Sequence, residues 1–230
     1  MRIASTSILV GLILQAAGTS ALAVPIANFS FEDVVIGSPF RSVDVADVPG
    51  WTRTGAAGDA ALWRVGYVDG AGSITVAGDG QQFVTMGGGF SSGGSTSGTT
   101  SWEQSIGGLV VGQAYLLDFL MAAEAAGGPF TSEGITQTLT ASLIGVGTTA
   151  QDFTATNTVG NYWQDWEAKS LAFTADATTM TLSFSYTGPY DVGLDNVRIT
   201  ERSSVPEPGT LALLGIALAG LGFARRRKLH

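Results

Sequence analysis

The sequence contains no cysteine and a single histidine, His230, and these absences exclude several kinds of chemistry. Without cysteine the chain forms neither disulfide bonds nor thiolate metal sites. Because the only histidine is the last residue, the rest of the chain holds no Ser-His-Asp triad, no Cys-His pair and no histidine-ligated transition metal. An enzyme built from this sequence would have to use carboxylates, as glycosidases do, or carboxylates with a hard cation.

Basic residues are scarce in the central part of the chain. Between residues 24 and 200, five lysines and arginines stand against seventeen aspartates and glutamates, a net charge of −12. This charge repels nucleic acid and anionic membranes, which makes both poor partners. It suits solubility, divalent cations or neutral sugars, and most of these carboxylates are expected to be solvated.

No long stretch of residues 24–202 has the 3.6-residue period of an amphipathic helix. Short alternating runs separated by glycine, aspartate, asparagine and proline predict an all-β sandwich instead. The clearest run is 179–186, and together with 169–174 it predicts a β-hairpin. The other predicted strands are 26–32, 62–67, 73–77, 82–86, 102–106, 113–122, 135–144 and 192–200. A short helix fits only at 122–126, and the Gly/Ser/Thr-rich segment 87–101 predicts a long mobile loop.

The N-terminal residues have the pattern of a signal peptide. Arg2 supplies a positive charge, Ile8–Leu14 an apolar core, and Ala21-Leu22-Ala23 a small-x-small cleavage site. The sequence therefore predicts a signal peptide over residues 1–23, removed by signal peptidase, and an exported domain over residues 24–202.

Residues 203–230 contain three features in the order that is typical of a C-terminal segment inserted into a membrane. A Pro-rich motif at 205–210 precedes an apolar segment at 210–224, predicted to be a single transmembrane helix, and a basic cluster at 225–230. The positive-inside rule places that cluster in the cytoplasm and the preceding domain outside. The helix would rise little more than about 20 Å against a hydrocarbon core of about 30 Å, so it is a marginal permanent anchor. An anchor that is never cut is the alternative.

The tail resembles the PEP-CTERM sorting signal of Gram-negative bacteria, which carries the signature seen here as Val205, Pro206, Glu207 and Pro208. This resemblance implies recognition by an exosortase, transient anchoring in the inner membrane, and release to the cell surface or the extracellular space. The family association is with exopolysaccharide and the biofilm matrix, so an extracellular polysaccharide becomes a candidate ligand.

The exported domain resembles the jelly-roll domains of the galactose-binding-like superfamily. The residues that carry this resemblance are the segments 28–32, 48–51, 79–84, 112–115, 163–173 and 193–199. The resemblance implies a carbohydrate-binding jelly roll with one structural Ca²⁺ between the first and last strands, held by Glu32 and Asp195.

A separate argument from strand parity concerns Asp195. It lies an even number of residues before Val197 and Ile199, so in a regular strand it is expected to point toward the core with them. Burying a carboxylate there without a partner costs free energy of folding. A cation or a set of backbone N–H groups would offset that expense. Calcium would need further oxygens, from carbonyls and from Asp79. Alternatively, Asp195 caps a turn or pairs with an arginine.

Sugar binding requires an exposed aromatic surface, and four residues are the candidates: Trp51, Trp163, Trp166 and Tyr190. Trp51 follows Pro49-Gly50 and Tyr190 follows Pro189, in loops that favour exposure. Trp163 and Trp166 are three residues apart, an odd interval that places them on opposite faces of a regular strand, so one of them is expected in the core.

Two pairs of carboxylates are candidates for acid–base catalysis. Asp165 and Glu167 share a strand face about 7 Å apart, within the range of an inverting glycosidase pair, and Glu124 and Glu133 bracket a loop. Such pairs are also common on solvated acidic faces. The leading hypothesis is a non-catalytic surface or matrix protein that binds exopolysaccharide. The alternatives are a carboxylate-dependent glycosidase or lyase, and a purely structural or adhesive protein.

Overall fold

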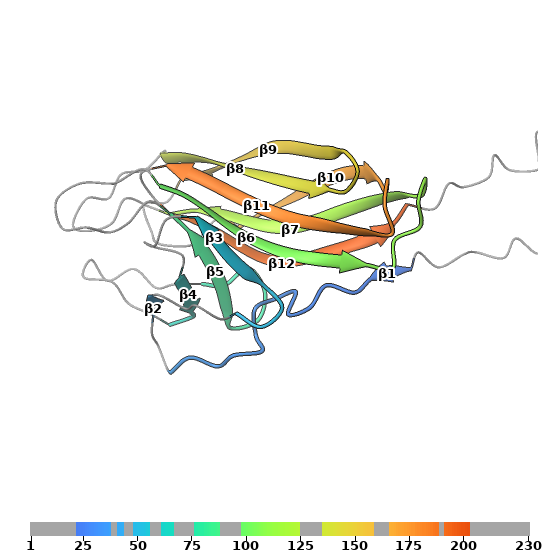
Figure 1. The fold of residues 1–230 in the computed structure, drawn as a ribbon. Helices are drawn as coiled ribbons and strands as arrows, with labels where there is room; N and C mark the ends of the chain where they lie inside the picture. The colour runs from blue at the N-terminus through green and yellow to red at the C-terminus, as the bar shows by residue number, and fades with distance from the viewer. Residues whose placement is uncertain are drawn as a thin grey trace, which may run out of the picture.

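The protein is a β-sandwich of two antiparallel sheets (Figure 1). The computed structural model describes residues 22–37, 41–43, 48–55, 61–66, 76–87, 98–124, 135–158, 166–188 and 191–202. The strands are β1 (Ala23–Val24), β2 (Arg41–Val43), β3 (Thr52–Gly55), β4 (Ala61–Arg64), β5 (Gln82–Met86), β6 (Gly98–Gly107), β7 (Ala114–Ala123), β8 (Ile135–Ile144), β9 (Thr148–Asn157), β10 (Glu167–Thr174), β11 (Thr179–Gly188) and β12 (Val192–Glu201). Within these ranges no helix has the length and hydrophobicity that a membrane span needs; the predicted span 210–224 lies outside them.

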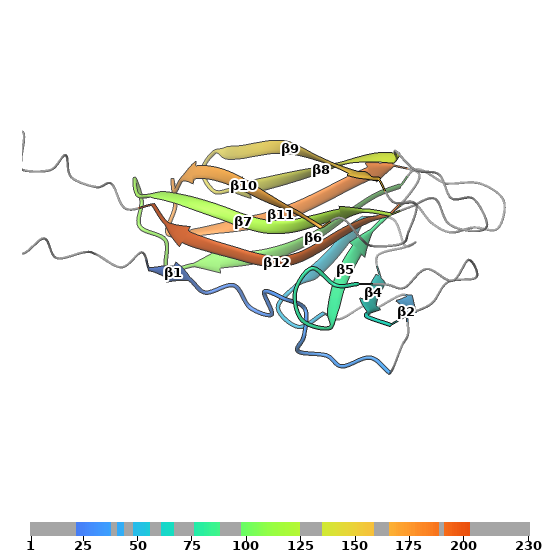
Figure 2. The same cartoon turned by 180° about the vertical axis from the view of Figure 1, so that it is seen from behind.

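The two sheets lie face to face, and most successive strands alternate between them. The seven-stranded sheet has the order β10-β7-β12-β5-β4-β2, with β1 also paired to β12, and it faces the viewer in Figure 2. The five-stranded sheet has the order β3-β6-β11-β8-β9. This arrangement confirms the predicted all-β sandwich.

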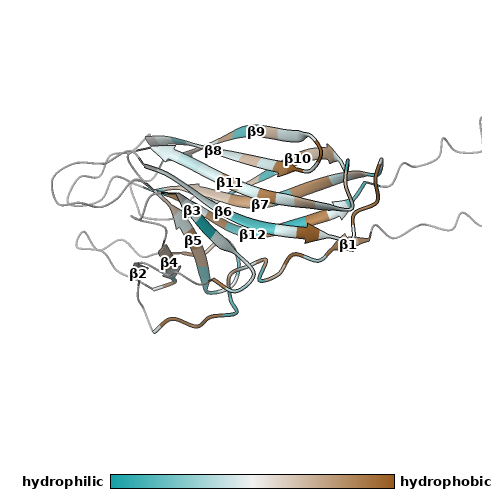
Figure 3. Ribbon diagram, in the orientation of Figure 1, coloured by the Kyte–Doolittle hydropathy of each residue, from teal (hydrophilic) through white to brown (hydrophobic). Residues whose placement is uncertain are grey.

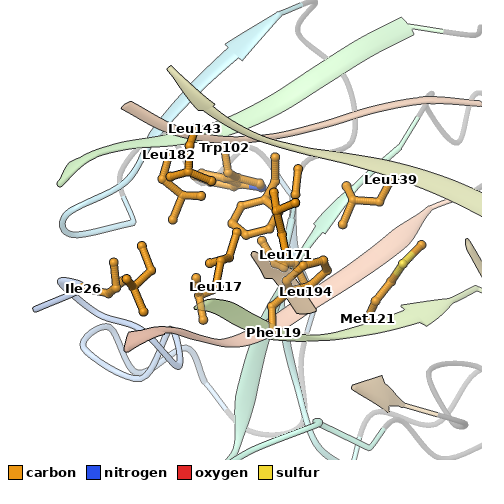
Figure 4. Close-up of a cluster of buried hydrophobic side chains, with 14 of the residues drawn as sticks. Ile26, Trp102, Leu117, Phe119, Met121, Leu139, Leu143, Leu171, Leu182 and Leu194 are labelled. Carbon is orange, nitrogen blue, oxygen red and sulfur yellow. The ribbon is translucent and has the colours of Figure 1, made fainter. Parts of the chain in front are cut away.

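The hydrophobic core fills the space between the sheets. Each long strand contributes every second residue, as the strand period of two requires. Figure 4 shows such side chains from both sheets meeting, including Trp102, Phe119 and Leu182. Trp102 and Leu182 are fully buried and Phe119 is nearly so. A domain without disulfide bonds depends on this core for its stability.

A second, smaller cluster lies apart from this core. Its buried members are Ala61, Trp63, Phe83 and Ala122, with Trp166 packed against them. The register pairs Trp63 with Phe83, and their rings stack at 6.5 Å between centroids. Their neighbours Leu62 and Val84 belong to the main core, so alternation places this cluster on the outer face of the seven-stranded sheet.

The predicted hairpin of residues 169–174 and 179–186 is wrong. Both strands form, but β10 pairs with β7 in one sheet, whereas β11 pairs with β6 and β8 in the other. The link 175–178 crosses between the sheets, and Ala175 is buried at the crossing. Both strands alternate toward the same core from opposite sides, so their pattern did not distinguish a hairpin from a crossover.

Four other predictions differ from the structure. Residues 26–32 form turns, because Asn28 and Phe31 have positive φ angles of 46° and 57°. Ala77 lies outside any strand, and β6 begins at Gly98, within the segment predicted as a loop. No helix begins at residue 122, since β7 continues to Ala123.

Strand β9 was not predicted from the sequence. It is an edge strand that pairs only with β8, and half of its residues are exposed. Its polar sequence therefore lacks the alternation by which buried strands are found. The turn before it, residues 145–147, makes β8 and β9 a hairpin.

The outer face of the five-stranded sheet is lined with hydroxyl groups. Threonine and serine occupy most outward positions of β6, β8, β9 and β11. Several are hydrogen-bonded across strands, for example Thr99 with Thr187 at 2.7 Å and Thr136 with Thr156 at 2.8 Å. This confirms the alternation predicted for residues 179–186.

Candidate functional site

The two predicted calcium ligands, Glu32 and Asp195, lie near enough to each other for the charge of Glu32 to raise the pKa of Asp195. Residues 27–33 form a tight turn, in which the Phe31 N–H donates to the Asn28 carbonyl at 3.1 Å. Asn28 and Phe31 have positive φ angles, and so does Asn196 on β12, with a φ of 49°. Residues held in such sparsely populated conformations cluster at functional sites, so these three mark the region for attention.

Asp195 is fully buried, but not in the main core. The pairing of β12 with β7 shifts register between Asp195 and Arg198, so parity does not carry from Asp195 to Val197. Leu194 lies in the main core, and Asp195 therefore points to the opposite face of the sheet. Burial was predicted correctly, but the predicted direction was wrong because of this bulge.

Backbone N–H groups hold the Asp195 carboxylate. Its oxygens accept hydrogen bonds from the Asp79 N–H and the Asn196 N–H, both at 2.7 Å. Burial nevertheless raises the pKa of Asp195 from 3.8 to about 8, and the negative charges of Asp79 and Glu32 add to this effect, against the two hydrogen bonds. Below pH 8 the folded protein therefore favours the neutral acid.

Glu32 holds the neighbouring loop. One of its oxygens accepts hydrogen bonds from the N–H groups of Gln81 and Gln82, at 2.6 and 2.7 Å. Gly80 has a φ of 65° and passes so close that an added Cβ would lie 2.4 Å from the same oxygen. The loop 79–82 therefore closes over Asp195 and is joined to the first turn by Glu32.

Glu32, Asp195 and Asp79 form an acidic group, of which Asp79 lies at the surface. Its carboxylate accepts a hydrogen bond from Ser30 at 3.1 Å and lies 3.8 Å from the guanidinium of Arg198. Carboxylate oxygens are the donors that Ca²⁺ prefers. However, no set of three or more acidic or histidine side chains in the described part of the chain is arranged to hold a metal ion. A calcium ion bound by Glu32 and Asp195 would thus take its other ligands from carbonyls and water.

Trp51 is a core residue, which contradicts its predicted role in sugar binding. It is 5 % exposed, its ring packs against Phe31 and Phe184, and its indole N–H donates to the Asn28 carbonyl at 3.2 Å. The loop before it is a tight turn, in which Gly50 has a φ of 82° and the Trp51 N–H bonds to Val48. This turn directs Trp51 back into the sandwich.

Trp166 is the only tryptophan of the described residues that keeps exposed surface, since Trp51, Trp63 and Trp102 are buried. Its ring lies edge-on to Phe83 at 5.0 Å, and its indole N–H donates to the Val76 carbonyl at 2.8 Å. Packing and the hydrogen bond fix the ring at the outer face of the seven-stranded sheet. The other two aromatic candidates, Trp163 and Tyr190, lie outside the described residues.

The predicted carboxylate pairs are not assembled as catalytic pairs by the described residues. Glu167 is bound to Lys169 at 2.6 Å and accepts a hydrogen bond from the Thr156 N–H at 3.3 Å, so it joins the edges of the two sheets. Its partner Asp165 lies outside the described residues, as does Glu133, the predicted partner of Glu124.

Glu124 is buried beside a residue that the sequence did not indicate, Asp191. They are 0 % and 2 % exposed, and two hydrogen bonds of 3.0 Å join them. The Asp191 N–H donates to the Glu124 carboxylate, and the Glu124 N–H donates to the Asp191 carbonyl. Glu124 is thus not part of a solvated acidic face. Each residue lies one position outside its neighbouring strand, Glu124 after β7 and Asp191 before β12, so strand alternation did not signal this pair.

A pocket of about 400 Å³ lies beside the acidic group. Its lining is formed by Ala23, Val24, Pro25, Ile26, Phe29, Val197, Arg198, Ile199 and Thr200. The lining is mostly apolar, and Arg198 lies over the Phe29 ring at 5.1 Å. It contains none of the aromatic residues predicted to bind sugar.

The PEP-CTERM protein-sorting motif matches residues 204–228. The chain carries a sorting signal. The match covers the segment in which Val205, Pro206, Glu207 and Pro208 were recognised, and it implies export and a surface or extracellular location. A search of curated proteins finds no match.

The fold is similar to that of solved carbohydrate-binding modules and adhesin domains. TmCBM61, solved in complex with β-1,4-galactotriose, superposes with a TM-score of 0.50 and 14 % identity, over 78 % of this chain and 99 % of that one. The K3 cleaved adhesin domain of Lys-gingipain from Porphyromonas gingivalis w83 gives a TM-score of 0.50 and 16 % identity, over 79 % and 99 %. At these identities the similarity establishes the jelly-roll sandwich fold.

Proposed function

We propose that this protein is an exported surface protein that binds an extracellular polysaccharide without catalysing a reaction on it. Its fold is shared with a module solved in complex with a galactose oligosaccharide, and its tail carries a sorting motif. The acidic domain favours a neutral or cation-bridged polysaccharide over an anionic one. The alternative, a carboxylate-dependent glycosidase or lyase, is disfavoured because Glu167 serves as a link between the sheets.

The observation that carries the proposal is the fixed, partly exposed ring of Trp166. Sugars bind protein through a rigid apolar surface combined with a few polar groups. Trp166 offers such a surface, held by Phe83 and by the Val76 carbonyl, so little freedom is lost when a ligand covers it. Trp163 and Tyr190 stay predicted sugar-binding residues, and both lie outside the described residues.

We expect Trp166→Ala to weaken binding of the organism's own exopolysaccharide by about tenfold or more, since an aromatic anchor at a hot spot contributes about 2 kcal/mol. The measurement is co-sedimentation or affinity electrophoresis of the purified protein. Phe29→Ala is the matched control, because Phe29 is another partly exposed aromatic but lies in the apolar pocket.

Thermal unfolding of both variants separates lost binding from lost folding. If Trp166→Ala folds and retains full affinity, the assignment of this residue is wrong. If the wild-type protein is not retained by the polysaccharide with or without Ca²⁺, the proposed function fails.

We further infer that Glu32 and Asp195 take up one Ca²⁺ ion. The support is electrostatic: a fully buried carboxylate lies among two other acids, and a divalent cation would offset their repulsion. The opposing observation is that backbone N–H groups already use part of both carboxylates. A carboxylate has about four acceptor positions, so positions remain for a cation.

Exosortase is the proposed processing partner, with the membrane-inserted segment 210–224 removed after export. We expect the intact mass of the secreted protein to lack both residues 1–23 and the apolar segment. Substituting Glu207→Ala in the sorting motif should leave the apolar segment attached. A wild-type mass that includes residues 211–230 would exclude cleavage and favour a permanent anchor.

A further inference from the structure

Three valines project from the end of the sandwich at which β12 finishes. Val110 and Val111 lie in the loop between β6 and β7 and are each 58 % exposed, and Val146 in the β8–β9 turn is 87 % exposed. Figure 3 shows brown, hydrophobic segments at this end of the molecule. We call these three residues the valine tip.

The loops that carry the valine tip are fixed to one another. The link 175–178 contacts both: the Leu109 N–H donates to Thr178, and the Gly112 N–H donates to Ala175. The Asp176 carboxylate accepts hydrogen bonds from the N–H groups of Val146 and Gly147, at 3.2 and 2.6 Å. Much of the backbone around the valines is therefore satisfied within the protein, and the side chains are held outward.

The chain leaves the domain beside this tip. The Arg202 N–H donates to the Ala114 carbonyl at 2.9 Å, and Gln113 donates to the Arg202 carbonyl at 3.0 Å. The eight residues 203–210 separate Arg202 from the apolar run that begins at Leu211. Leu211 is nine residues after Arg202, a span of at most about 32 Å, so the exit point stays within that distance of an inserted segment.

We propose that the valine tip contacts the bilayer that holds the segment 210–224, as long as that segment remains attached. This proposal rests on the membrane insertion included in the proposed function. Three apolar side chains beside the membrane tether, on a backbone with most of its hydrogen bonds made, suit the headgroup–acyl boundary. The net charge of −12 disfavours anionic lipid, so the contact is apolar and is strongest on zwitterionic bilayers.

The test uses the full chain reconstituted in phosphatidylcholine vesicles. Because the native chain has no cysteine, the variants Val111→Cys and Val146→Cys each accept a single environment-sensitive fluorophore. Thr138→Cys is the matched control, since Thr138 is exposed on β8, six residues before its end at Ile144. We expect a blue shift and quenching by spin-labelled lipid at 111 and 146, and neither at 138.

A second variant makes the result independent of the label. Adding Val110→Asp to the Val146→Cys protein should abolish most of the quenching at 146, because the charge opposes insertion of the shared tip. Equal accessibility of all three labels to the aqueous phase would overturn the proposal, as would shielding that persists in detergent and thus reports a second copy of the chain. Co-flotation with vesicles reports insertion of the tail separately, so a chain that floats without quenching rejects the tip alone.

Discussion

Trp51→Ala is expected to lower the free energy of unfolding by about 3–5 kcal/mol, the usual loss for a buried tryptophan. The ring is 5 % exposed and packs against Phe31 and Phe184, and its indole N–H is bonded to Asn28. Its removal leaves a cavity and takes one of two hydrogen bonds from the Asn28 carbonyl, which still accepts the Phe31 N–H, at the turn that positions Glu32. Chemical denaturation followed by far-UV circular dichroism measures the change.

The control for this prediction is Trp166→Ala, which removes the same side chain from a partly exposed position. We expect a smaller loss of stability there, because less apolar surface returns to water. Equal losses at both positions would contradict the assignment of Trp51 to the core. A stable Trp51→Ala protein with weakened polysaccharide binding would restore the role predicted from the sequence.

The comparison of Trp51 and Trp166 indicates what the sequence can specify about a binding surface. Residue type identified the aromatic candidates, but exposure depends on how a turn directs the chain. Pro49-Gly50 indicates a turn, and Gly50 adopts the positive φ that such turns need. Whether the following tryptophan points outward or inward depends on the sheets that pack around it, and no local pattern encodes this.

The same limit applies to topology and to the acidic group. Alternation in residues 179–186 predicted which side chains are buried, but it did not specify the sheet in which the strand lies. Glu32 lies near enough to Asp195 for its charge to raise the pKa of that carboxyl, and the calcium that the resemblance implies stays a prediction. The bulge at Asn196 could not be predicted from the sequence, because asparagine adopts positive φ in many contexts and does not by itself indicate a bulge.

Asp195 provides the second large effect, a dependence of stability on pH. Its pKa is raised from 3.8 to about 8 in the folded protein, chiefly by burial. A raised pKa means that the folded state binds the proton more tightly than the unfolded state, so the stability it contributes is complete below pH 4 and is lost as the pH rises through 8. With about 1.4 kcal/mol for each pKa unit, the loss between pH 5 and pH 8 is about 4 kcal/mol in the presence of EDTA.

The matched variant Asp195→Asn isolates this contribution, since its amide does not ionise. Its loss of one hydrogen-bond acceptor is the same at every pH, so the difference in unfolding free energy between wild type and variant should change with pH only through Asp195. A flat difference would refute the raised pKa. Calcium then separates the two ways of holding this carboxylate. If an ion binds Glu32 and Asp195, it stabilises the charged form and flattens the wild-type curve, whereas curves that coincide in calcium and EDTA leave the backbone N–H groups as its only partners.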